Sequence, residues 1–309
     1  MRYIDIVLTD NFPILSLSLI TEPLRVVNRE RMQQVYAWRF LSVEGGRVSS
    51  SSGIEIETLS LDYEQADVIL LLSAYQPEKS IIPRLLSWLR KRSKEDVLLG
   101  CVDTAALIFA EAGLLSHIPA ATHFEAIRGY SELYPGKFFI DRLFHVAGNR
   151  CSSAGGVATI DMTLKLIEKF DGGDIVRSVA EILTYKPSDH DNIQQKLLVN
   201  TSIQRMDRNL AKAVDLMLVA LDQPLSICVI AERVGMPAWK LNRLFKKHLK
   251  KTSSNYYRYL RLQQAKNLVK YSHLSIAQLA ALCGFENPET FSRAYKREFG
   301  LTAANERAL

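Results

Sequence analysis

The sequence predicts an α/β domain, with a mostly parallel sheet covered by helices on both faces, followed by an all-α domain with two helix-turn-helix units. Short runs of Val, Ile and Leu alternate with amphipathic segments over the first half of the chain. After about residue 206 only helical periodicity remains, and a layout of helix, glycine and basic helix occurs twice there. A chain of 309 residues with 48% hydrophobic content is long enough for two packed cores.

Four apolar runs in the first half have the composition of buried parallel strands, which are hydrophobic along their whole length. They are Tyr3–Leu8, Trp38–Val43, Asp67–Leu72 and Asp96–Cys101. Between them, residues 12–30 and 81–94 carry apolar residues at three-to-four spacing, as crossover helices do. This alternation indicates a flavodoxin-like open sheet, which binds its ligands at the carboxyl ends of the strands.

Two strand-to-helix corners are expected at that edge of the sheet. Residues 100–115, GCVDTAALIFAEAGLL, are typical of a buried strand that turns sharply into an apolar helix. A second strand ends at about Cys151 and turns through Ser152–Gly156 into a helix that extends to Phe170. Period-two alternation places Cys101 on the same strand face as Asp103 but within the strand, so we expect Cys101 to pack in the core.

Several classes of protein are disfavoured by composition. The four cysteines are widely scattered and lack the paired spacing of zinc sites, so we expect reduced thiols, no metal site and no cofactor. No apolar segment has the length of a membrane span, and the first residues do not resemble a signal peptide. We therefore expect a soluble, cytoplasmic protein that does not bind membranes.

Charge is distributed unevenly along the chain. Residues 1–199 hold 21 Lys and Arg against 25 Asp and Glu, whereas residues 200–309 hold 18 against 8. Such an asymmetry indicates that the C-terminal part binds a polyanion, although a solvated basic face would give the same counts. A polar stretch, Tyr185–Gln195, separates the two parts. The predicted boundaries are 1–185 for the α/β domain, 186–206 for a linker and 207–309 for the helical domain.

The helical domain contains the same layout twice. Each unit opens with Leu-Ser-Ile, whose serine is placed to cap a helix, and passes through a glycine into a second helix rich in Arg and Lys. The units are Leu225–Leu249 and Leu274–Gly300, with the serines Ser226 and Ser275 and the glycines Gly235 and Gly284. A long helix, Ser253–Tyr271, is expected to hold the two units in a fixed relation. A tandem pair within a basic domain is more specific than either unit alone.

Residues 207–309 resemble the DNA-binding domain of the AraC family of transcriptional regulators. The resemblance rests on YLRLQQAKNLV in the long helix and on IAQLAALCGFENPETFSRAYKREFGLT in the second unit. It implies that one recognition helix of each unit enters the major groove of double-stranded DNA, in successive segments on one face of the duplex.

Side-chain direction then identifies candidate DNA contacts on each recognition helix. On the first, Trp239, Asn242 and Arg243 project away from the apolar stripe; Arg243 can pair with guanine and Asn242 with adenine. On the second, the outward residues are Glu289, Thr290 and Arg293. Glu289 can accept from cytosine or only complement the helix dipole, and both interpretations stay open. The phosphate candidates in the predicted site are Lys240, Lys246 and Lys296.

The first domain resembles the ThiJ/PfpI-like, class I glutamine amidotransferase-like domain that precedes an AraC-type domain in GlxA-type regulators. EPLRVVN, AEAGLL, ATHFEAI and SSAGGVATIDMTLKLI carry the resemblance over residues 1–185. In enzymes of this superfamily the nucleophilic cysteine occupies the corner at which this chain has Asp103. A carboxylate cannot supply thiolate chemistry, but it can hold a cation. The resemblance also implies an effector among amine metabolites such as arginine, glycine betaine or carnitine.

The predicted ligand site is therefore built around the first corner. Its residues are Asp103, Thr104, Ala105, Phe12, Tyr75, His123 and Phe124. The aromatic members are included because a methylated ammonium group prefers aromatic faces, although each is also an ordinary packing residue. The alternative for Asp103 is that it only caps the following helix.

We expect a transcriptional regulator, an activator, that responds to a small effector and has no catalytic residues. A homodimer is expected because two adjacent half-sites multiply weak contacts, and RNA polymerase is a further candidate partner. The alternative is an active hydrolase or amidase fused to a DNA-binding module, which a reactive Cys101 thiol of low pKa would support.

Overall fold

The computed structural model describes residues 1–62, 66–115, 118–136, 138–188, 195, 203 and 206–307. Most of the predicted linker, 186–206, lies outside the described residues. The chain divides into two compact units, Met1–Ile127 with Tyr134–Gln195 and Arg128–Leu133 with Lys196–Leu309. Among the helices of the described ranges, none combines the length and the apolar character that a membrane crossing requires.

The first unit contains an eight-stranded sheet in the order β3-β4-β2-β1-β5-β6-β10-β9. The strands are β1 (Arg2–Leu8), β2 (Tyr36–Leu41), β3 (Glu44–Ser49), β4 (Glu55–Ser60), β5 (Val68–Ser73), β6 (Leu98–Asp103), β9 (Phe144–Ala147) and β10 (Arg150–Ser153). Within this sheet only the two edge strands, β3 and β9, pair antiparallel with their neighbours. Two short strands, β7 (Ala120–Ala121) and β8 (Phe139–Ile140), pair with each other in parallel. The predicted mostly parallel sheet is confirmed.

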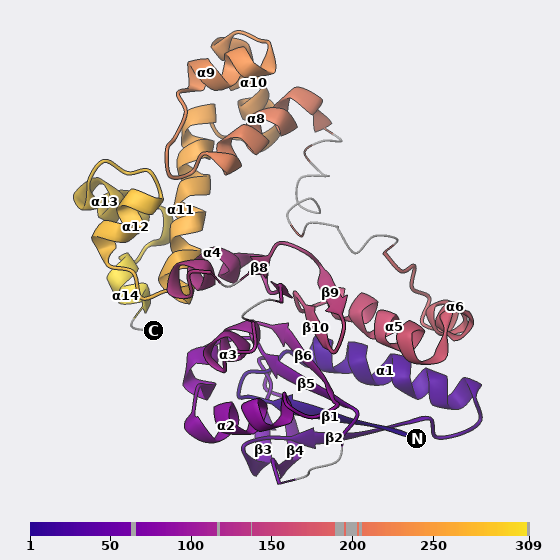
Figure 1. The fold of residues 1–309 in the computed structure, drawn as a ribbon. Coiled ribbons are helices and arrows are strands. Elements are labelled where there is room, and N and C mark those ends of the chain that lie inside the picture. Colours follow the sequence, from indigo (N-terminus) through magenta and orange to yellow (C-terminus); the bar gives the residue numbers. More distant parts are fainter. Residues whose placement is uncertain are drawn as a thin grey trace. The chain divides into compact units, whose positions relative to one another are not determined.

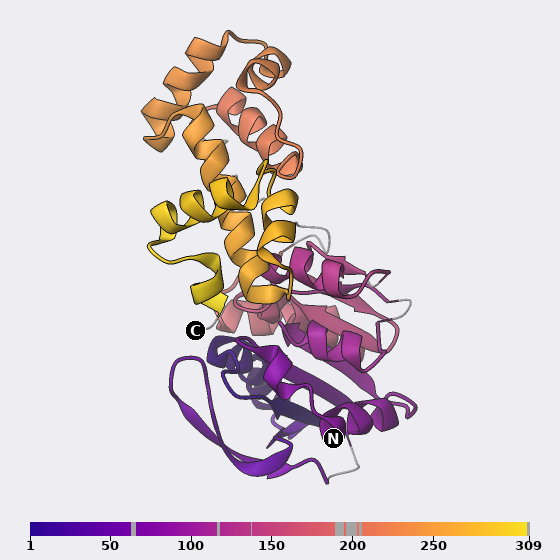
Figure 2. The same cartoon turned by 90° about the vertical axis from the view of Figure 1, so that its left-hand side faces the viewer.

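Helices cover both faces of this sheet, as Figures 1 and 2 show. One face carries α1 (Ile14–Glu30), α5 (Ala158–Asp171) and α6 (Gly173–Ile182), and the other carries α2 (Pro83–Arg92) and α3 (Ala106–Glu111). A 3₁₀ turn, η1 (Pro77–Ser80), follows β5, and α4 (Phe124–Leu133) follows β7. All six residues of β5 are buried, which is why a run such as VILLLS is apolar on both faces.

The strands differ from the sequence prediction in several places: β2 lies two residues earlier than expected, and β7, β8 and β9 were not predicted. The prediction missed the hairpin of β3 and β4, in which exposed and polar residues outnumber buried ones. β6 also extends two residues beyond Cys101, because Ser73 of β5 pairs with Asp103 and continues the parallel ladder to the corner. Asp103 is therefore the last residue of the strand as well as the first residue of the turn.

Apart from residues 128–133 at the end of α4, the described part of the second unit consists of helices joined by short turns. They are α8 (Arg208–Val219), α9 (Ile227–Val234), α10 (Ala238–Leu249), α11 (Ser253–Tyr271), α12 (Ile276–Leu282), α13 (Pro288–Phe299) and α14 (Ala303–Arg307). Two apolar clusters form, and α11 contributes Tyr257 to the first and Leu262 to the second. The predicted long helix is confirmed with the same bounds.

The predicted helix caps of the second unit are also confirmed. Ser226 Oγ accepts a hydrogen bond from the Val229 amide at 3.2 Å. Ser275 forms a reciprocal capping box with Gln278. Gly235 and Gly284 have φ of 77° and 68°, the left-handed conformation that the turn between the two helices requires. Local sequence therefore fixes both helix-turn-helix units.

Gly100 in β6 lies in a tightly packed part of the sheet. A Cβ atom at this position would lie 2.4 Å from Cys151 Sγ and 2.5 Å from Leu70 Cδ2, whereas one at Gly173, the first residue of α6, would meet nothing within 4 Å. We predict that Gly100→Ala lowers the free energy of unfolding by about 1–3 kcal/mol. Gly173→Ala, the matched control, should leave it unchanged or slightly higher. Urea unfolding of both variants checks the prediction, and equal effects would contradict it.

Candidate functional site

The two strand-to-helix corners meet at the carboxyl edge of the sheet. Asp103 ends β6 in a left-handed conformation with φ of 65°, and α3 follows with Ala105 at its N-cap position. At the second corner Gly155 has φ of 85°, and a Cβ atom there would lie 2.5 Å from Asp103 Oδ2. The carboxylate of Asp103 therefore lies directly against the backbone of Gly155, which joins the two corners as predicted.

Left-handed residues follow several neighbouring strands at this edge. Asn11 after β1 has φ of 61°, and Gln76 after β5 has φ of 54°. A residue other than glycine in this conformation costs about 1–3 kcal/mol, so such residues persist where the surrounding structure imposes them. Together with Asp103, the last residue of β6, they mark the carboxyl ends of three adjacent parallel strands, the edge at which open α/β sheets bind ligands.

Thr104 and Ala105 support the corner from within the protein. Both are buried. Thr104 Oγ1 lies 3.0 Å from the carbonyl oxygen of Ser73 and 2.7 Å from that of Ala74, and it donates to them. The Thr104 amide donates to the same Ser73 oxygen at 3.0 Å. These bonds attach the turn after β6 to the end of β5 and hold the backbone of Asp103 in place.

The four predicted aromatic and histidine residues have different surroundings. Phe12 is completely buried in the core between the sheet and α1, whereas Tyr75 is 50% exposed just after β5. The rings of His123 and Phe124 lie 4.7 Å apart between centroids. Thr122 Oγ1 donates to the Asp103 carbonyl oxygen at 2.6 Å, which brings the segment that contains His123 and Phe124 to the corner. The ring of Phe12 is enclosed by the core instead.

Cys101 is a core residue, as predicted. It is 1% exposed, and burial raises the pKa of its thiol well above the ordinary value, with neighbouring Cys151 adding to the shift. Burial likewise raises the pKa of Cys151 to about 12. A cysteine nucleophile needs a lowered pKa and access to its substrate, and neither thiol has them.

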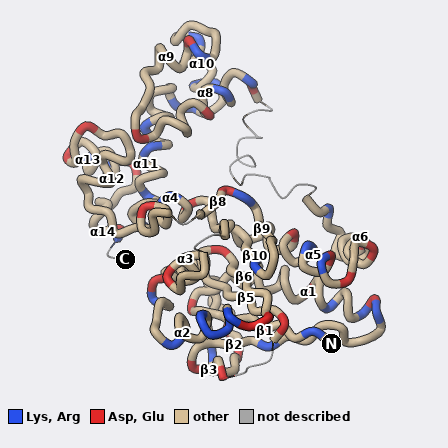
Figure 3. Tube along the Cα trace, in the orientation of Figure 1, with Lys and Arg blue, Asp and Glu red and all other residues tan. Residues whose placement is uncertain are grey.

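The recognition helices present most of the predicted DNA contacts to solvent. On α10, Leu241 and Phe245 are completely buried, and Trp239 is 67% exposed. The other exposed predicted residues are Lys240, Arg243 and Lys246 on α10, and Glu289, Thr290, Arg293 and Lys296 on α13. Figure 3 shows the basic residues along α10. Asn287 caps α13 and Pro288 is its first residue, as expected for an N-terminal proline.

Asn242 has an internal partner that sequence reasoning missed. Its Oδ1 accepts hydrogen bonds from the Ser253 amide at 3.0 Å and from Ser253 Oγ at 3.3 Å. Ser253 is buried and begins α11, so Asn242 satisfies an amide that has no partner within that helix. A bidentate contact to adenine would need the same oxygen. Helical periodicity cannot reveal this role, because it depends on how α10 packs against α11.

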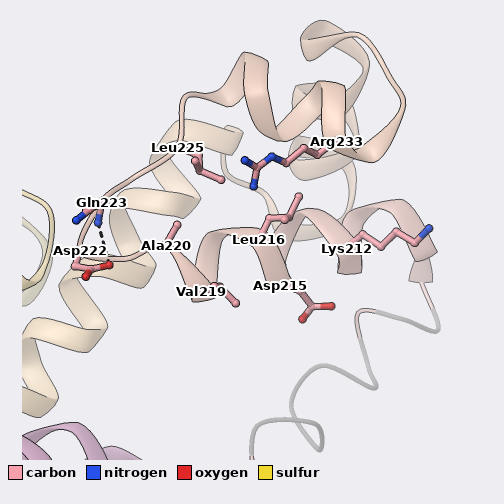
Figure 4. Close-up of a pocket in the computed structure, with 9 residues that line it drawn as sticks. All are labelled: Lys212, Asp215, Leu216, Val219, Ala220, Asp222, Gln223, Leu225 and Arg233. Atoms are coloured by element: carbon pink, nitrogen blue, oxygen red, sulfur yellow. Dashed lines mark hydrogen bonds between the residues drawn. The ribbon is translucent and has the colours of Figure 1, made fainter.

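The second unit also has a pocket of about 680 Å³ beside α8 and α9, away from the predicted DNA contacts. Figure 4 shows Arg233 of α9 extending toward Leu216 and Leu225. The lining residues are Lys212, Asp215, Leu216, Val219, Ala220, Asp222, Gln223, Leu225 and Arg233. Sequence reasoning did not select any of them, because their mixture of charged and apolar residues is typical of an ordinary amphipathic helix.

The chain is similar to known proteins in both its helical part and its α/β part. A family model for a helix-turn-helix domain matches residues 230–308. The chain is 34% identical over 304 residues to the HTH-type transcriptional regulator CdhR of Pseudomonas aeruginosa. The aligned region covers 98% of this chain and 90% of that protein. It is 28% identical over 308 residues to the HTH-type transcriptional regulator GlxA of Rhizobium meliloti, with coverage of 98% and 94%.

Solved structures share the fold. An AraC family transcriptional regulator from Pseudomonas putida matches with a TM-score of 0.55 and 24% identity, over 59% of this chain and 100% of that one. A ThiJ/PfpI family protein from Pseudomonas syringae matches with a TM-score of 0.52 and 16% identity, over 68% and 88%. The chain therefore belongs to the AraC family of HTH-type transcriptional regulators, and its N-terminal domain has the ThiJ/PfpI-like fold.

Proposed function

We propose that this regulator is an activator whose binding to DNA responds to a small amine or quaternary-ammonium metabolite held at the Asp103 corner. The observation that carries the proposal is the position of Asp103, a carboxylate in a left-handed conformation against Gly155, where two corners of the sheet meet. Such a carboxylate is a counter-ion for a cationic group. The half-exposed Tyr75 and the Phe124 ring are candidates for the aromatic faces that favour a methylated ammonium.

On the DNA side, we assign base contacts to Trp239, Arg243, Glu289, Thr290 and Arg293, and phosphate contacts to Lys240, Lys246 and Lys296. Their exposure on α10 and α13 supports this assignment. Asn242 is retained only as a positioning residue for α11, because of its bonds to Ser253. A homodimer would place two such domains on neighbouring half-sites, and RNA polymerase would be the partner in activation.

The proposed effector site is tested by removing the negative charge of Asp103. We predict that arginine, glycine betaine or carnitine raises the melting temperature of the full chain, because a ligand that binds only the folded state stabilises it. Asp103→Asn keeps the size of the side chain and its tolerance of a left-handed backbone, and it should abolish the shift. Asp96→Asn removes a charge just before the same strand, at its amino end, and should respond like the wild type. A wild-type shift that survives in Asp103→Asn would exclude the corner as the cation site.

Base and phosphate contacts are distinguished by two substitutions on α10. Arg243→Ala should cost about 1–3 kcal/mol at one base position and relax specificity there. Lys246→Ala should weaken binding to all sequences alike and reduce the salt dependence. Binding titrations on single-base variants of a selected duplex, at two salt concentrations, measure both effects. Uniform weakening by Arg243→Ala would contradict a base-reading role.

The internal role of Asn242 predicts a loss of stability. Asn242→Ala removes the partner of the buried Ser253 amide and should lower the free energy of unfolding by about 1–3 kcal/mol. Lys240→Ala, at an exposed position of the same helix, should change it by less than about 0.5 kcal/mol. Urea unfolding compares the two variants. Unchanged stability together with lost discrimination at one base pair would instead make Asn242 a base-reading residue.

A further inference from the structure

We propose that Gln195 is a positioning residue that connects the Asp103 corner to the segment leading to the DNA-binding unit. The inference rests on the proposed effector site and adds how occupancy of that site is transmitted. Gln195 belongs to the predicted linker, yet it lies in the first compact unit and is only 9% exposed. A buried polar side chain in a polar connecting segment needs specific partners, and Gln195 has them.

The side chain of Gln195 is held by three hydrogen bonds. Its Oε1 accepts from the Phe124 amide at 2.9 Å. Its Nε2 donates to the carbonyl oxygens of Thr122 at 2.9 Å and Arg142 at 3.0 Å, which uses both of its protons. The Gln195 amide donates in addition to Asp141 Oδ1 at 3.1 Å. One glutamine thus joins two segments of the first unit, residues 122–124 and residues 141–142.

Each of these two segments is attached to one corner of the sheet. Thr122 Oγ1 donates to the Asp103 carbonyl oxygen at 2.6 Å, so residues 122–124 are attached to the corner after β6. The Ala154 amide, after β10, donates to the Leu143 carbonyl oxygen at 2.8 Å, so the residue next to the second segment is attached to the other corner. Gln195 therefore bridges the two places between which the carboxylate of Asp103 lies.

This arrangement couples the effector to the linker. A cation held by Asp103 beside His123 and Phe124 favours the conformation of residues 122–124 that also binds Gln195. Effector binding and the Gln195 contacts then stabilise each other, because both select the same state. Gln195 is the last residue of the first compact unit, and α8 of the DNA-binding unit has Asp207 as its N-cap, so Gln195 precedes the DNA-binding unit by only twelve positions in the sequence.

A second attachment of the linker provides the matched control. Asp161 of α5 accepts hydrogen bonds from Ser188 N at 3.0 Å, Ser188 Oγ at 2.9 Å and Tyr185 Oη at 2.9 Å. Ser188→Ala removes one bond between the linker and the same unit without touching residues 122–124 or 141–142. It should therefore leave the coupling intact, whereas Gln195→Ala should remove it.

The first arm of the test uses the full chain without effector, so it does not depend on the proposed function. In amide hydrogen exchange, Gln195→Ala should speed exchange of residues 122–126 and 141–144 by on the order of tenfold, and Ser188→Ala should not. Thr122→Val, which removes only the hydroxyl bond to Asp103, should speed exchange in the first segment alone. Wild-type exchange rates in Gln195→Ala would overturn the bridge, and Gln195→Glu, which keeps the size of the side chain but replaces the donor amide by a carboxylate, is the deciding variant if Gln195→Ala does not fold.

The second arm measures coupling on a duplex selected from a random-sequence library. With arginine, glycine betaine or carnitine, whichever raises the melting temperature, the wild type and Ser188→Ala should change their Kd for DNA by about fivefold or more. Gln195→Ala should still show the thermal shift but less than a twofold change in Kd. A full response in Gln195→Ala would refute the coupling. If none of the three compounds shifts the wild type, the effector proposal fails and the exchange arm alone decides the bridge.

Discussion

The parallel register of β6 between β5 and β10 is the constraint on which the candidate ligand site depends. Ser73 lies opposite Asp103, and Ser153 lies opposite Val102, so three strands end at nearly the same level. Parallel strands must leave the sheet toward crossover helices at this edge, and the available space is small. The chain turns at Asp103 by adopting a left-handed conformation, and Gly155 leaves room for the carboxylate because it has no side chain.

The strain at this corner is balanced by contacts that lie behind it. The bonds of Thr104 to Ser73 and Ala74 and the bond of Thr122 to Asp103 hold the backbone on both sides of the left-handed residue. The completely buried strands supply the remaining stability, which does not depend on the identity of the corner residue. The fold can therefore accept different side chains at the corner, and the chemistry of the site is set by which one is present.

Features that depend on local sequence could be predicted, whereas features that depend on contacts between distant segments could not. Helix caps such as Ser275 and turn glycines such as Gly235 act over a few residues, and the bounds of the helix-turn-helix units were accordingly visible in the sequence. The corner residue, Asp103, was predicted from the resemblance, which sets the register at AEAGLL, whereas the apolar run alone ended the strand at Cys101. The bridge by Gln195 and the bond of Asn242 to Ser253 were not found, because each joins segments whose contact depends on tertiary packing. An amide side chain in a polar segment has no pattern that distinguishes an internal partner from water.

The two recognition helices have the same layout but a different balance of charge. On α10, Lys240, Arg243, Lys246 and Lys247 have no acidic neighbour in the helix, whereas α13 combines Arg293, Lys296 and Arg297 with Glu289 and Glu298. Glu298 also forms an ion pair with Lys251 at 3.1 Å. The first helix-turn-helix unit, which contains α10, therefore has the larger surplus of positive charge available for phosphate contacts, which raise affinity for any sequence. On the proposed assignment, the second helix-turn-helix unit, with less surplus charge, would depend relatively more on base contacts.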